Sequence, residues 1–282
     1  MLQVDQILPI FTYQSTIKLI SWNVRGLNGP EKYRMLKNMI LQEQPHIVFM
    51  QETKCSTSTL EPILSKAWAG CQTTIVDATG ASGGLAIAWN SQRISLTNIH
   101  ASHYFIQAMF HLIGTNIHRH LTNVYFPQES TQKIKQLETL KILNAPRAYP
   151  LWITGGDFNM ITQLEEKLGG RRKLDKESNE FKAYIQHNSL MDPPFDNDIF
   201  TWNNKRVGTQ QIPSRLDRFL LSDNFFHLGG DISASILPLA GSDHWPISLQ
   251  WKNPGNSNRK SFKFEAFWLT HPEFNTMVKD AR

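Results

Sequence analysis

Apolar runs of strand length alternate with longer amphipathic stretches along most of the chain. Continuous apolar runs bounded by Gly, Asn or Pro are typical of strands that are buried on both faces. Two such runs joined by a short turn containing Gly114 are typical of a hairpin. These patterns predict strands at Ile17–Trp22, His46–Met50, Gly83–Trp89, Ala108–Ile113, Ile117–Phe126, Leu151–Thr154, Phe200–Trp202, Arg215–Ser222 and Trp245–Trp251.

Three stretches carry apolar residues at helical spacing. The first begins at Pro30, because a proline is tolerated in the first turn of a helix, and it runs to about Gln44. The other two are Gln132–Leu143 and Glu177–Leu190. Helices interleaved with strands and a hairpin predict an α/β protein with mixed sheets.

The character of the chain changes after Trp251. Lys252–Ser261 is polar and contains Gly, Asn and Pro, as linkers do, whereas Phe262–Arg282 is rich in aromatic residues. We therefore expect an N-terminal extension over residues 1–16, one domain over residues 17–251, and a linker with the start of a truncated downstream region over residues 252–282.

Charge and cysteine content narrow the class of protein. Lys and Arg number 29 against 24 Asp and Glu, so the net charge is +5, which is compatible with a polyanionic partner. Cys55 and Cys71 are too few for a disulfide framework, and we expect two free thiols in a reducing compartment. No apolar run approaches the ~20 residues of a membrane helix. Met1–Ser15 lacks the basic start of a signal peptide, so we expect neither membrane association nor secretion.

Polar residues with catalytic potential fall where the apolar strands begin or end. Each is weak evidence alone, because an acid at a strand end often caps a turn. Acids and amides that start from buried strand ends can nevertheless converge on one rim of a rigid scaffold. The evidence for a site is that this placement at strand ends recurs along the chain. It involves Asn23, Glu52, Asp157 with Asn159, Asp217, and Asp243 with His244.

Six short motifs in sequence order carry a family resemblance. They are Ser-Trp-Asn23-Val-Arg-Gly, Gln-Glu52-Thr, Val-Tyr125, Gly-Asp157-Phe-Asn159, Ser-Arg-Leu-Asp217-Arg-Phe and Gly-Ser-Asp243-His244. Over roughly Ile17 to Trp251 the chain resembles the endonuclease/exonuclease/phosphatase superfamily, which includes DNase I, exonuclease III and apurinic endonucleases. More narrowly, it resembles the endonuclease domain of plant LINE-type retrotransposons. The resemblance implies a four-layer α/β sandwich, with two mixed sheets packed face to face and helices outside.

The resemblance also implies roles for individual residues in hydrolysis of a phosphodiester. Glu52 resembles the main metal ligand, with Asn23 beside it and Asp243 as a further acid, and oxygen ligands suit Mg²⁺ or Mn²⁺. Asp157 resembles the group that deprotonates the attacking water, with Asn159 holding it in place. The remaining implied roles are phosphate contact by His244 and Tyr125, orientation of His244 by Asp217, and substrate contact by Thr201, Trp202 and Ser242.

Arg25 departs from one branch of the superfamily. DNA-repair members carry an acid two residues after the matching Asn, as a second metal ligand, and this chain has Arg25 there. The difference disfavours an apurinic endonuclease and leaves the number of metal ions open. Arg25 could instead contact a phosphate or lie on the surface.

Two weaker patterns have competing interpretations. His118 and His120 alternate onto one face of the predicted hairpin, with His111 across the turn, but no Cys or acid is spaced to complete a zinc site. The basic loop Gly169–Lys173 is compatible with phosphate contact, nuclear import or simple solvation.

The favoured hypothesis is a Mg²⁺-dependent DNA endonuclease of a LINE-type retroelement that nicks target DNA and leaves a 3′-OH, acting in the nucleus. The segment Phe262–Trp268 resembles the connection to a reverse transcriptase, a domain expected downstream in a full-length element. Three alternatives stay open: an apurinic-type repair nuclease, a small-molecule or lipid phosphodiesterase on the same fold, and an inactive relic that at most binds nucleic acid.

Overall fold

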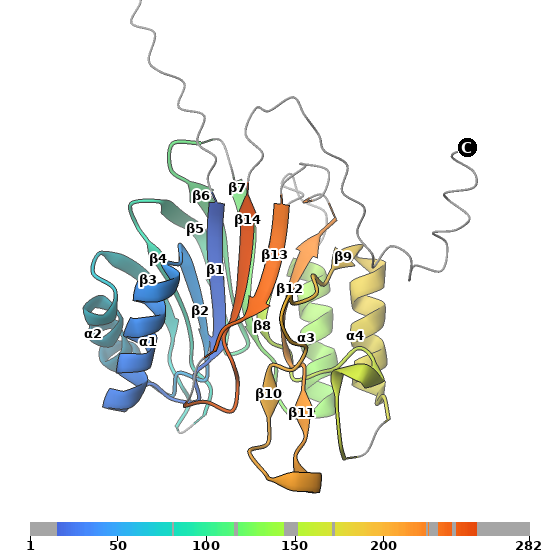
Figure 1. Ribbon diagram of the computed structural model, residues 1–282. Helices are drawn as coiled ribbons and strands as arrows, with labels where there is room; N and C mark the ends of the chain where they lie inside the picture. Colours follow the sequence, from blue (N-terminus) through green and yellow to red (C-terminus); the bar gives the residue numbers. More distant parts are fainter. Residues whose placement is uncertain are drawn as a thin grey trace, which may run out of the picture.

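Two six-stranded sheets form the centre of the molecule in the computed structural model (Figure 1). The structure describes residues 16–80, 82–115, 118–143, 152–170, 173–223, 225, 231–238 and 241–252. The first sheet has the order β13 (Asp231–Ile236), β14 (Ile247–Lys252), β1 (Thr16–Asn23), β2 (Ile47–Gln51), β4 (Leu85–Asn90), β3 (Cys71–Val76). The second has the order β5 (Ile94–Ala101), β6 (Phe105–Leu112), β7 (His118–Tyr125), β8 (Trp152–Asp157), β12 (Asp217–Ser222), β9 (Leu190–Met191).

Both sheets are mixed. In the first, β1 and β2 are parallel and the other pairs are antiparallel; in the second, β7 and β8 are the parallel pair. A separate two-stranded hairpin, β10 (Trp202–Asn203) with β11 (Pro213–Ser214), projects from the lower end of the sandwich in Figure 1. Short 3₁₀ turns at Leu164–Glu166 and Gly208–Gln210 complete the elements other than the helices.

The helices cover the outer faces of the two sheets (Figure 1). Residues of α1 (Pro30–Glu43) and α2 (Thr57–Ala67) pack in one apolar cluster with β1, β2 and β4. Residues of α3 (Ser130–Leu143) and α4 (Lys176–His187) pack in another with β7, β12 and the segment after β8. The layer order of helix, sheet, sheet and helix confirms the expected four-layer α/β sandwich.

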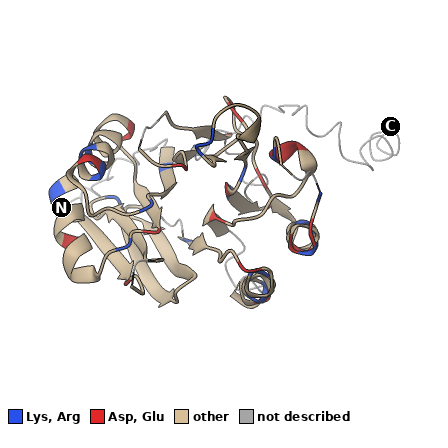
Figure 2. Cartoon of the chain, turned by 90° about the horizontal axis from the view of Figure 1, so that it is seen from below, with Lys and Arg blue, Asp and Glu red and all other residues tan. Residues whose placement is uncertain are grey.

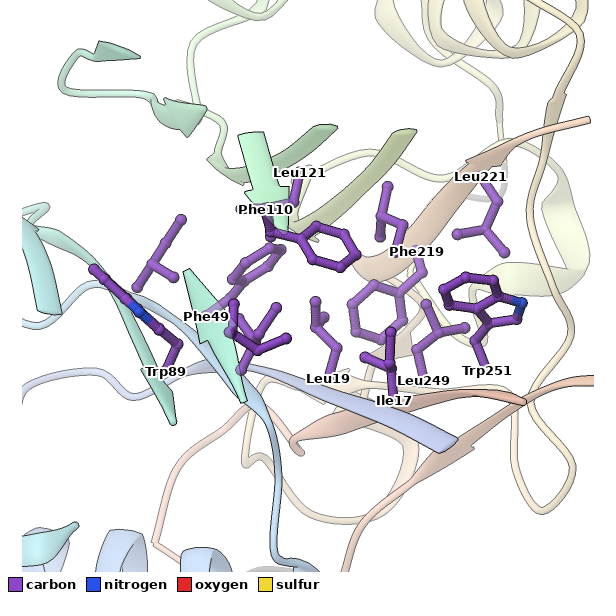
Figure 3. Packing of buried hydrophobic residues seen from close by; sticks show 14 of the residues in the cluster. Ile17, Leu19, Phe49, Trp89, Phe110, Leu121, Phe219, Leu221, Leu249 and Trp251 are labelled. Atoms are coloured by element: carbon purple, nitrogen blue, oxygen red, sulfur yellow. The ribbon is translucent and has the colours of Figure 1, made fainter. Parts of the chain in front are cut away.

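The two sheets face each other across the largest apolar cluster, which Figure 3 shows from close by. Phe49 of β2 lies there with Phe110 of β6 and Phe219 of β12. Along β2, Phe49 faces the other sheet and Val48 faces the helices, because successive strand side chains alternate between faces. Burial on both faces explains why the central strands are continuous apolar runs rather than alternating ones.

Each predicted strand and helix overlaps an observed one, but α2, β3, β5, β9, β11 and β13 were not predicted. Strands β9 and β11 have two residues each, which is too short for a recognisable pattern. Helix α2 contains Pro62 and begins Thr-Ser-Thr, which hides its helical pattern. Strands β3, β5 and β13 lie at sheet edges and are only partly buried, so their apolar pattern is weak. Residues 1–15 of the predicted N-terminal extension and residues 253–282 of the predicted linker and downstream region lie outside the described residues. Thr16 and Lys252, at the inner ends of these segments, belong to β1 and β14. Among the helices that the structure describes, none is long and apolar enough to cross a membrane.

Candidate active site

Three buried side chains from separate segments meet at the end of the sandwich from which the β10–β11 hairpin projects. Asp157 ends β8 and lies opposite Asp217, the first residue of β12. Nδ1 of His244 donates to Oδ2 of Asp217 at 2.9 Å, and its Nε2 lies 3.8 Å from Oδ2 of Asp157. The ligand atoms of the three residues lie within 4.8 Å of one another. Within the described ranges this is the only group of three or more His, Cys, Asp or Glu with a spacing that could hold a metal ion.

Charge is unevenly distributed over these three groups. Burial alone would lower the pKa of His244, but the carboxylates of Asp217 and Asp157 outweigh it and raise the pKa to about 9. Burial, with a smaller contribution from Asp217, raises the pKa of Asp157 above its usual range, even though His244 and Asn23 act in the opposite direction. The cluster therefore combines a cationic imidazole with a carboxyl group whose affinity for protons is increased.

Asn23 connects the two sheets at this end. Its Nδ2 donates to Oε1 of Glu52 at 3.1 Å and to Oδ2 of Asp157 at 2.9 Å. The backbone N–H of Arg25 donates to Oδ1 of Asn23, which fixes the orientation of the amide. Asn23 thereby holds the carboxylates of Glu52 and Asp157 on either side of its amide group.

Glu52 follows β2 directly and has a strained backbone. Its φ is +49°, and Arg25, Lys54 and Asn159 also have positive φ. A positive φ is unfavourable for residues other than Gly and persists where the surrounding structure imposes it, often at functional sites. Burial alone would raise the pKa of Glu52, but Asn23, Arg25, Tyr125 and Lys54 together hold it below its usual range. Glu52 is therefore a buried carboxylate held in its charged form.

Asn159 and Tyr125 flank Asp157. The backbone N–H of Asn159 donates to Oδ1 of Asp157 at 2.9 Å, and its Nδ2 donates to the carbonyl of Phe126 at 2.7 Å. Tyr125 pairs with Asp157 across the parallel strands β7 and β8. Burial and the nearby carboxylates of Glu52 and Asp157 raise the pKa of Tyr125, so its hydroxyl stays protonated and remains a donor.

Arg25 lies between two acids of the site. Its Nε and Nη2 donate to the two carboxylate oxygens of Asp243 at 3.0 and 2.9 Å. Its Nη1 lies 3.1 Å from Oε1 and 3.3 Å from Oε2 of Glu52. Arg25 is thus neither a free surface residue nor a distant one, because its guanidinium bridges Glu52 and Asp243.

Three expected substrate-side residues are bonded to the framework. Oγ1 of Thr201 accepts from the backbone N–H groups of Leu216 and Asp217, both at 3.0 Å. Oγ of Ser242 donates to the carbonyl of Asn23 at 3.0 Å. Nε1 of Trp202 donates to Oδ2 of Asp243 at 3.0 Å. These bonds fix the segments that carry the acids.

The histidine pattern lies at the end of β7 opposite Tyr125, whereas the basic loop follows Leu168, whose backbone N–H donates to the carbonyl of Pro213 in β11. His111 and His118 pair across the β6–β7 hairpin with stacked rings 4.5 Å apart. In the basic loop, Arg171 and Arg172 lie outside the described residues. Cys55 and Cys71 are free thiols.

The sequence matches the model of the Endonuclease/Exonuclease/phosphatase family over residues 20–244. The chain belongs to this family. All of the motif residues named above, from Asn23 to His244, fall within the matched range. No curated protein sequence matches the chain.

Solved structures of the family share its fold at low sequence identity. The AP endonuclease LMAP from Leishmania major has a TM-score of 0.67 and 17% identity over 85% of this chain and 88% of that one. The endonuclease domain of TRAS1, a telomere-specific non-LTR retrotransposon, has a TM-score of 0.63 and 14% identity over 85% of this chain and 99% of that one. The 3′ phosphatase NExo from Neisseria, bound to a product DNA hairpin, has a TM-score of 0.66 and 15% identity over 83% of this chain and 99% of that one. These likenesses establish the fold.

Sequence reasoning missed three residues that lie beside the candidate site. Nζ of Lys54 lies 3.5 Å from Oε2 of Glu52, and Nε2 of Gln128 donates to Oδ1 of Asn159 at 2.6 Å. Lys32 bonds to the carbonyl of Val24, and burial together with Lys205 lowers its pKa to about 8. Lys54 was detectable, because it follows Glu52 by two residues in Gln-Glu-Thr-Lys. Lys32 and Gln128 follow ordinary helix and loop patterns and gave no such signal.

Proposed function

We propose that this protein is a metal-dependent phosphodiester hydrolase that cuts DNA, of the kind with which LINE-type retroelements nick target DNA and leave a 3′-OH. The observation that carries the proposal is the continuous hydrogen-bonded series from Glu52 through Asn23 to Asp157, with the His244–Asp217 pair beside it. This series spans both sheets. It therefore places a charged carboxylate, a carboxyl with raised pKa and a cationic imidazole around one location.

Asp157 takes the role of general base toward the attacking water. A carboxyl whose pKa is raised toward neutrality is a better base than an ordinary aspartate, because its affinity for the proton is higher. The backbone N–H of Asn159 fixes Oδ1 of Asp157, which leaves Oδ2 toward Asn23 and His244. This orientation gives the water one defined acceptor.

His244 and Tyr125 contact the scissile phosphate in this proposal. Both present donors: the imidazole is cationic because its pKa is raised, and the phenol stays protonated for the same reason. Asp217 fixes the proton on Nδ1 of His244, so Nε2 points into the site. Cationic donors bind phosphate oxygens with short, charge-assisted hydrogen bonds.

Glu52 and Asp243 would hold the metal ion, with Asn23 beside them and its Nδ2 bonded to Glu52. Their donor set consists of oxygen atoms only, which fits Mg²⁺ or Mn²⁺ rather than zinc. Such a cation, when bound, stabilises negative charge on the phosphate and on the leaving oxygen.

Cations and an exposed hairpin near the site support a nucleic acid substrate. Lys32 and Lys54 lie beside the acids, and the projecting β10–β11 hairpin carries Lys205 and Arg206 in its exposed loop. Figure 2 looks onto this end of the molecule and marks its basic and acidic residues. Contacts with backbone phosphates position a duplex independently of its sequence. The expected nuclear location belongs to the same proposal.

Arg25 favours the retroelement type over the apurinic repair type. A guanidinium bonded to Glu52 and Asp243 takes the position where the repair branch carries an acid. A phosphodiesterase acting on small molecules or lipids on the same fold is the second candidate, since the family also includes phosphatases.

Nicking of supercoiled plasmid tests the proposal. Wild-type protein with Mg²⁺ or Mn²⁺ should convert the plasmid to the open circle, and EDTA should stop the reaction. Glu52→Gln and His244→Ala should lose nicking by about 10²-fold or more. Their matched controls, the exposed residues in Glu61→Gln and His187→Ala, should retain it.

Parallel substrates separate the alternatives. Preference for an abasic duplex over an intact one would favour the repair nuclease, and turnover of phosphoinositides without nicking would favour the lipid phosphodiesterase. A folded wild-type protein that binds DNA but cleaves none of these substrates would be an inactive relic.

A further inference from the structure

The guanidinium of Arg25 occupies the space between the two acids that the proposed function assigns to the metal. Its Nε and Nη2 form a bidentate contact with the carboxylate of Asp243, at 3.0 and 2.9 Å. Its Nη1 lies within 3.3 Å of both carboxylate oxygens of Glu52. Planar guanidinium groups match carboxylates in this way better than lysine can. Both acids therefore already have a counter-charge that belongs to the chain.

A divalent ion on Glu52 requires the same oxygen atoms. Mg²⁺ binds carboxylate oxygens at ~2.0–2.1 Å and demands near-octahedral geometry. Nη1 of Arg25 lies 3.1 Å from Oε1 and 3.3 Å from Oε2, so it covers both of those oxygens. The ion and Nη1 cannot both approach Glu52 in this arrangement, and repulsion between the two cations adds to the conflict.

The contact with Asp243 is different. Nε and Nη2 hold Asp243 with two hydrogen bonds, and Trp202 donates a third. Of the guanidinium nitrogens, only Nη1 contacts Glu52, at longer distances. Glu52 also accepts from Nδ2 of Asn23 and lies 3.5 Å from Nζ of Lys54. The side chain of Arg25 is 36% exposed, so it has room to move away from Glu52.

We propose that Arg25 is a built-in cation of the metal centre: it keeps Asp243 away from the metal, and a single divalent ion binds at Glu52 only when Nη1 of Arg25 is displaced. This inference rests on the metal site of the proposed function and revises the role of Asp243 there. It assigns to Arg25 a positioning role that lowers metal affinity and limits the centre to one ion.

Removing the guanidinium should therefore strengthen metal binding. Direct titration of the full chain with Mn²⁺, followed by electron paramagnetic resonance without DNA, measures affinity and stoichiometry independently of cleavage. Wild-type protein should bind one Mn²⁺ at Glu52, and Arg25→Gln should bind it about two- to fivefold more tightly, which is the order of one exposed ionic contact with screening. Arg25→Lys should lie between them, because one ammonium cannot hold both acids.

Two controls separate this effect from a general change of charge. Lys205→Gln removes a nearby positive charge that contacts neither acid, and it should leave the affinity close to wild type. The double variant Glu52→Gln/Arg25→Gln should lose the gain, because the displaced contact no longer exists. Stabilisation by Mn²⁺ in thermal unfolding should follow the same order.

The outcomes distinguish the inference from the proposed function. Unchanged or weaker Mn²⁺ binding by a folded Arg25→Gln protein, with wild-type binding intact, would overturn the role of Arg25 and leave the nuclease proposal standing. Equal gains in Arg25→Gln and Lys205→Gln would also overturn it. Absence of Mn²⁺ binding at millimolar concentration in wild type and variant alike would overturn the inference together with the metal site.

Discussion

Strand β12 separates two buried clusters of charge that differ in how their charges are balanced. On one side, Asp217 belongs to the group with Asp157 and His244. On the other, the next residue, Arg218, forms a second cluster with Glu166, Asp192 and Arg215, which we call the structural charge cluster. Neighbouring residues of a strand point to opposite faces, so Asp217 and Arg218, the first two residues of β12, reach different clusters.

The structural charge cluster is balanced within itself. Arg218 donates to Glu166 at 2.9 Å and to Asp192 at 2.6 Å, and Arg215 contacts the same two acids at 3.3 and 2.6 Å. Burial alone would raise the pKa of Glu166, but Arg218 and Arg215 lower it. Two cations and two anions, nearly all buried, neutralise one another within the cluster.

The group of Asp157, Asp217 and His244 is unbalanced. Two carboxyl groups share one imidazole, and the pKa of Asp157 is raised where that of Glu166 is lowered. Unequal pairing of this kind is how active sites obtain groups that exchange protons near neutrality. Buried charge is therefore common to both clusters, and the mismatch of charges is what distinguishes the group to which we assign the function.

Substitution of Asp217 and Arg218, which are adjacent in β12, gives the strongest test of the difference between the two clusters. Asp217→Asn should lower DNA cleavage by about 10²- to 10⁴-fold, because His244 loses its anionic partner, while the protein stays folded. Arg218→Met should instead leave Glu166 and Asp192 buried with less counter-charge, and lower the free energy of unfolding by about 3–5 kcal/mol. Cleavage assays and urea unfolding measure the two effects, with exposed Arg34→Met as control. If both variants lost cleavage per folded molecule, the two clusters would act together in cleavage, and the distinction between them would be wrong.

The second test uses pH. The folded-state pKa of Glu166 is lowered, so its stabilising contribution is complete above the ordinary glutamate pKa of ~4.3 and is lost as pH falls through the lower folded value. From about pH 5 downward, wild-type stability should therefore fall more steeply than that of Glu166→Gln. Urea midpoints from pH 7 to about pH 3 test this, with the exposed neighbour in Glu165→Gln as control. Parallel curves for wild type and Glu166→Gln would show that the cluster is not held by this carboxylate.

The central fold and the acids of the site were predictable, since both leave strong local patterns. Strands such as β2 are buried on both faces, and that leaves a continuous apolar run. Asp157 and Glu52 stand at the ends of such runs, so a conspicuous pattern marks their position along the chain. Edge strands such as β5 bury little and could not be recognised in the same way.

The partners of those residues were not predictable, because they are joined by tertiary contacts between distant segments. Nothing near Arg218 in the sequence indicates that Glu166 and Asp192 complete its cluster. Arg25 was recognised as unusual, but its contact with Asp243 joins residues 218 positions apart. Thr201 was assigned to the substrate, and its hydrogen bonds to the backbone of β12 appear only in three dimensions.

Thr201 offers the finest test of how the two sides of β12 are kept apart. Its buried hydroxyl accepts from the backbone N–H groups of Leu216 and Asp217, at the start of the strand. Thr201→Val keeps the shape but leaves two buried donors without an acceptor, so we expect a loss of about 1–3 kcal/mol in the free energy of unfolding. A smaller decrease in cleavage should accompany it, because Asp217 is less firmly placed against His244.

Thr154 of β8 is the matched control for this substitution. It is buried like Thr201, and its hydroxyl has no hydrogen-bond partner, so Thr154→Val should be neutral or slightly stabilising. If both variants unfold at the same urea concentration as wild type, the hydroxyl of Thr201 does not anchor β12, and the placement of Asp217 must come from its pairing with Asp157 alone. If Thr201→Val alone is destabilised and cleaves less, the position of Asp217 depends on a residue that contacts its backbone rather than its carboxylate. The separation of catalytic from structural charge would then be set by the backbone of β12 and its anchors, rather than by the charges themselves.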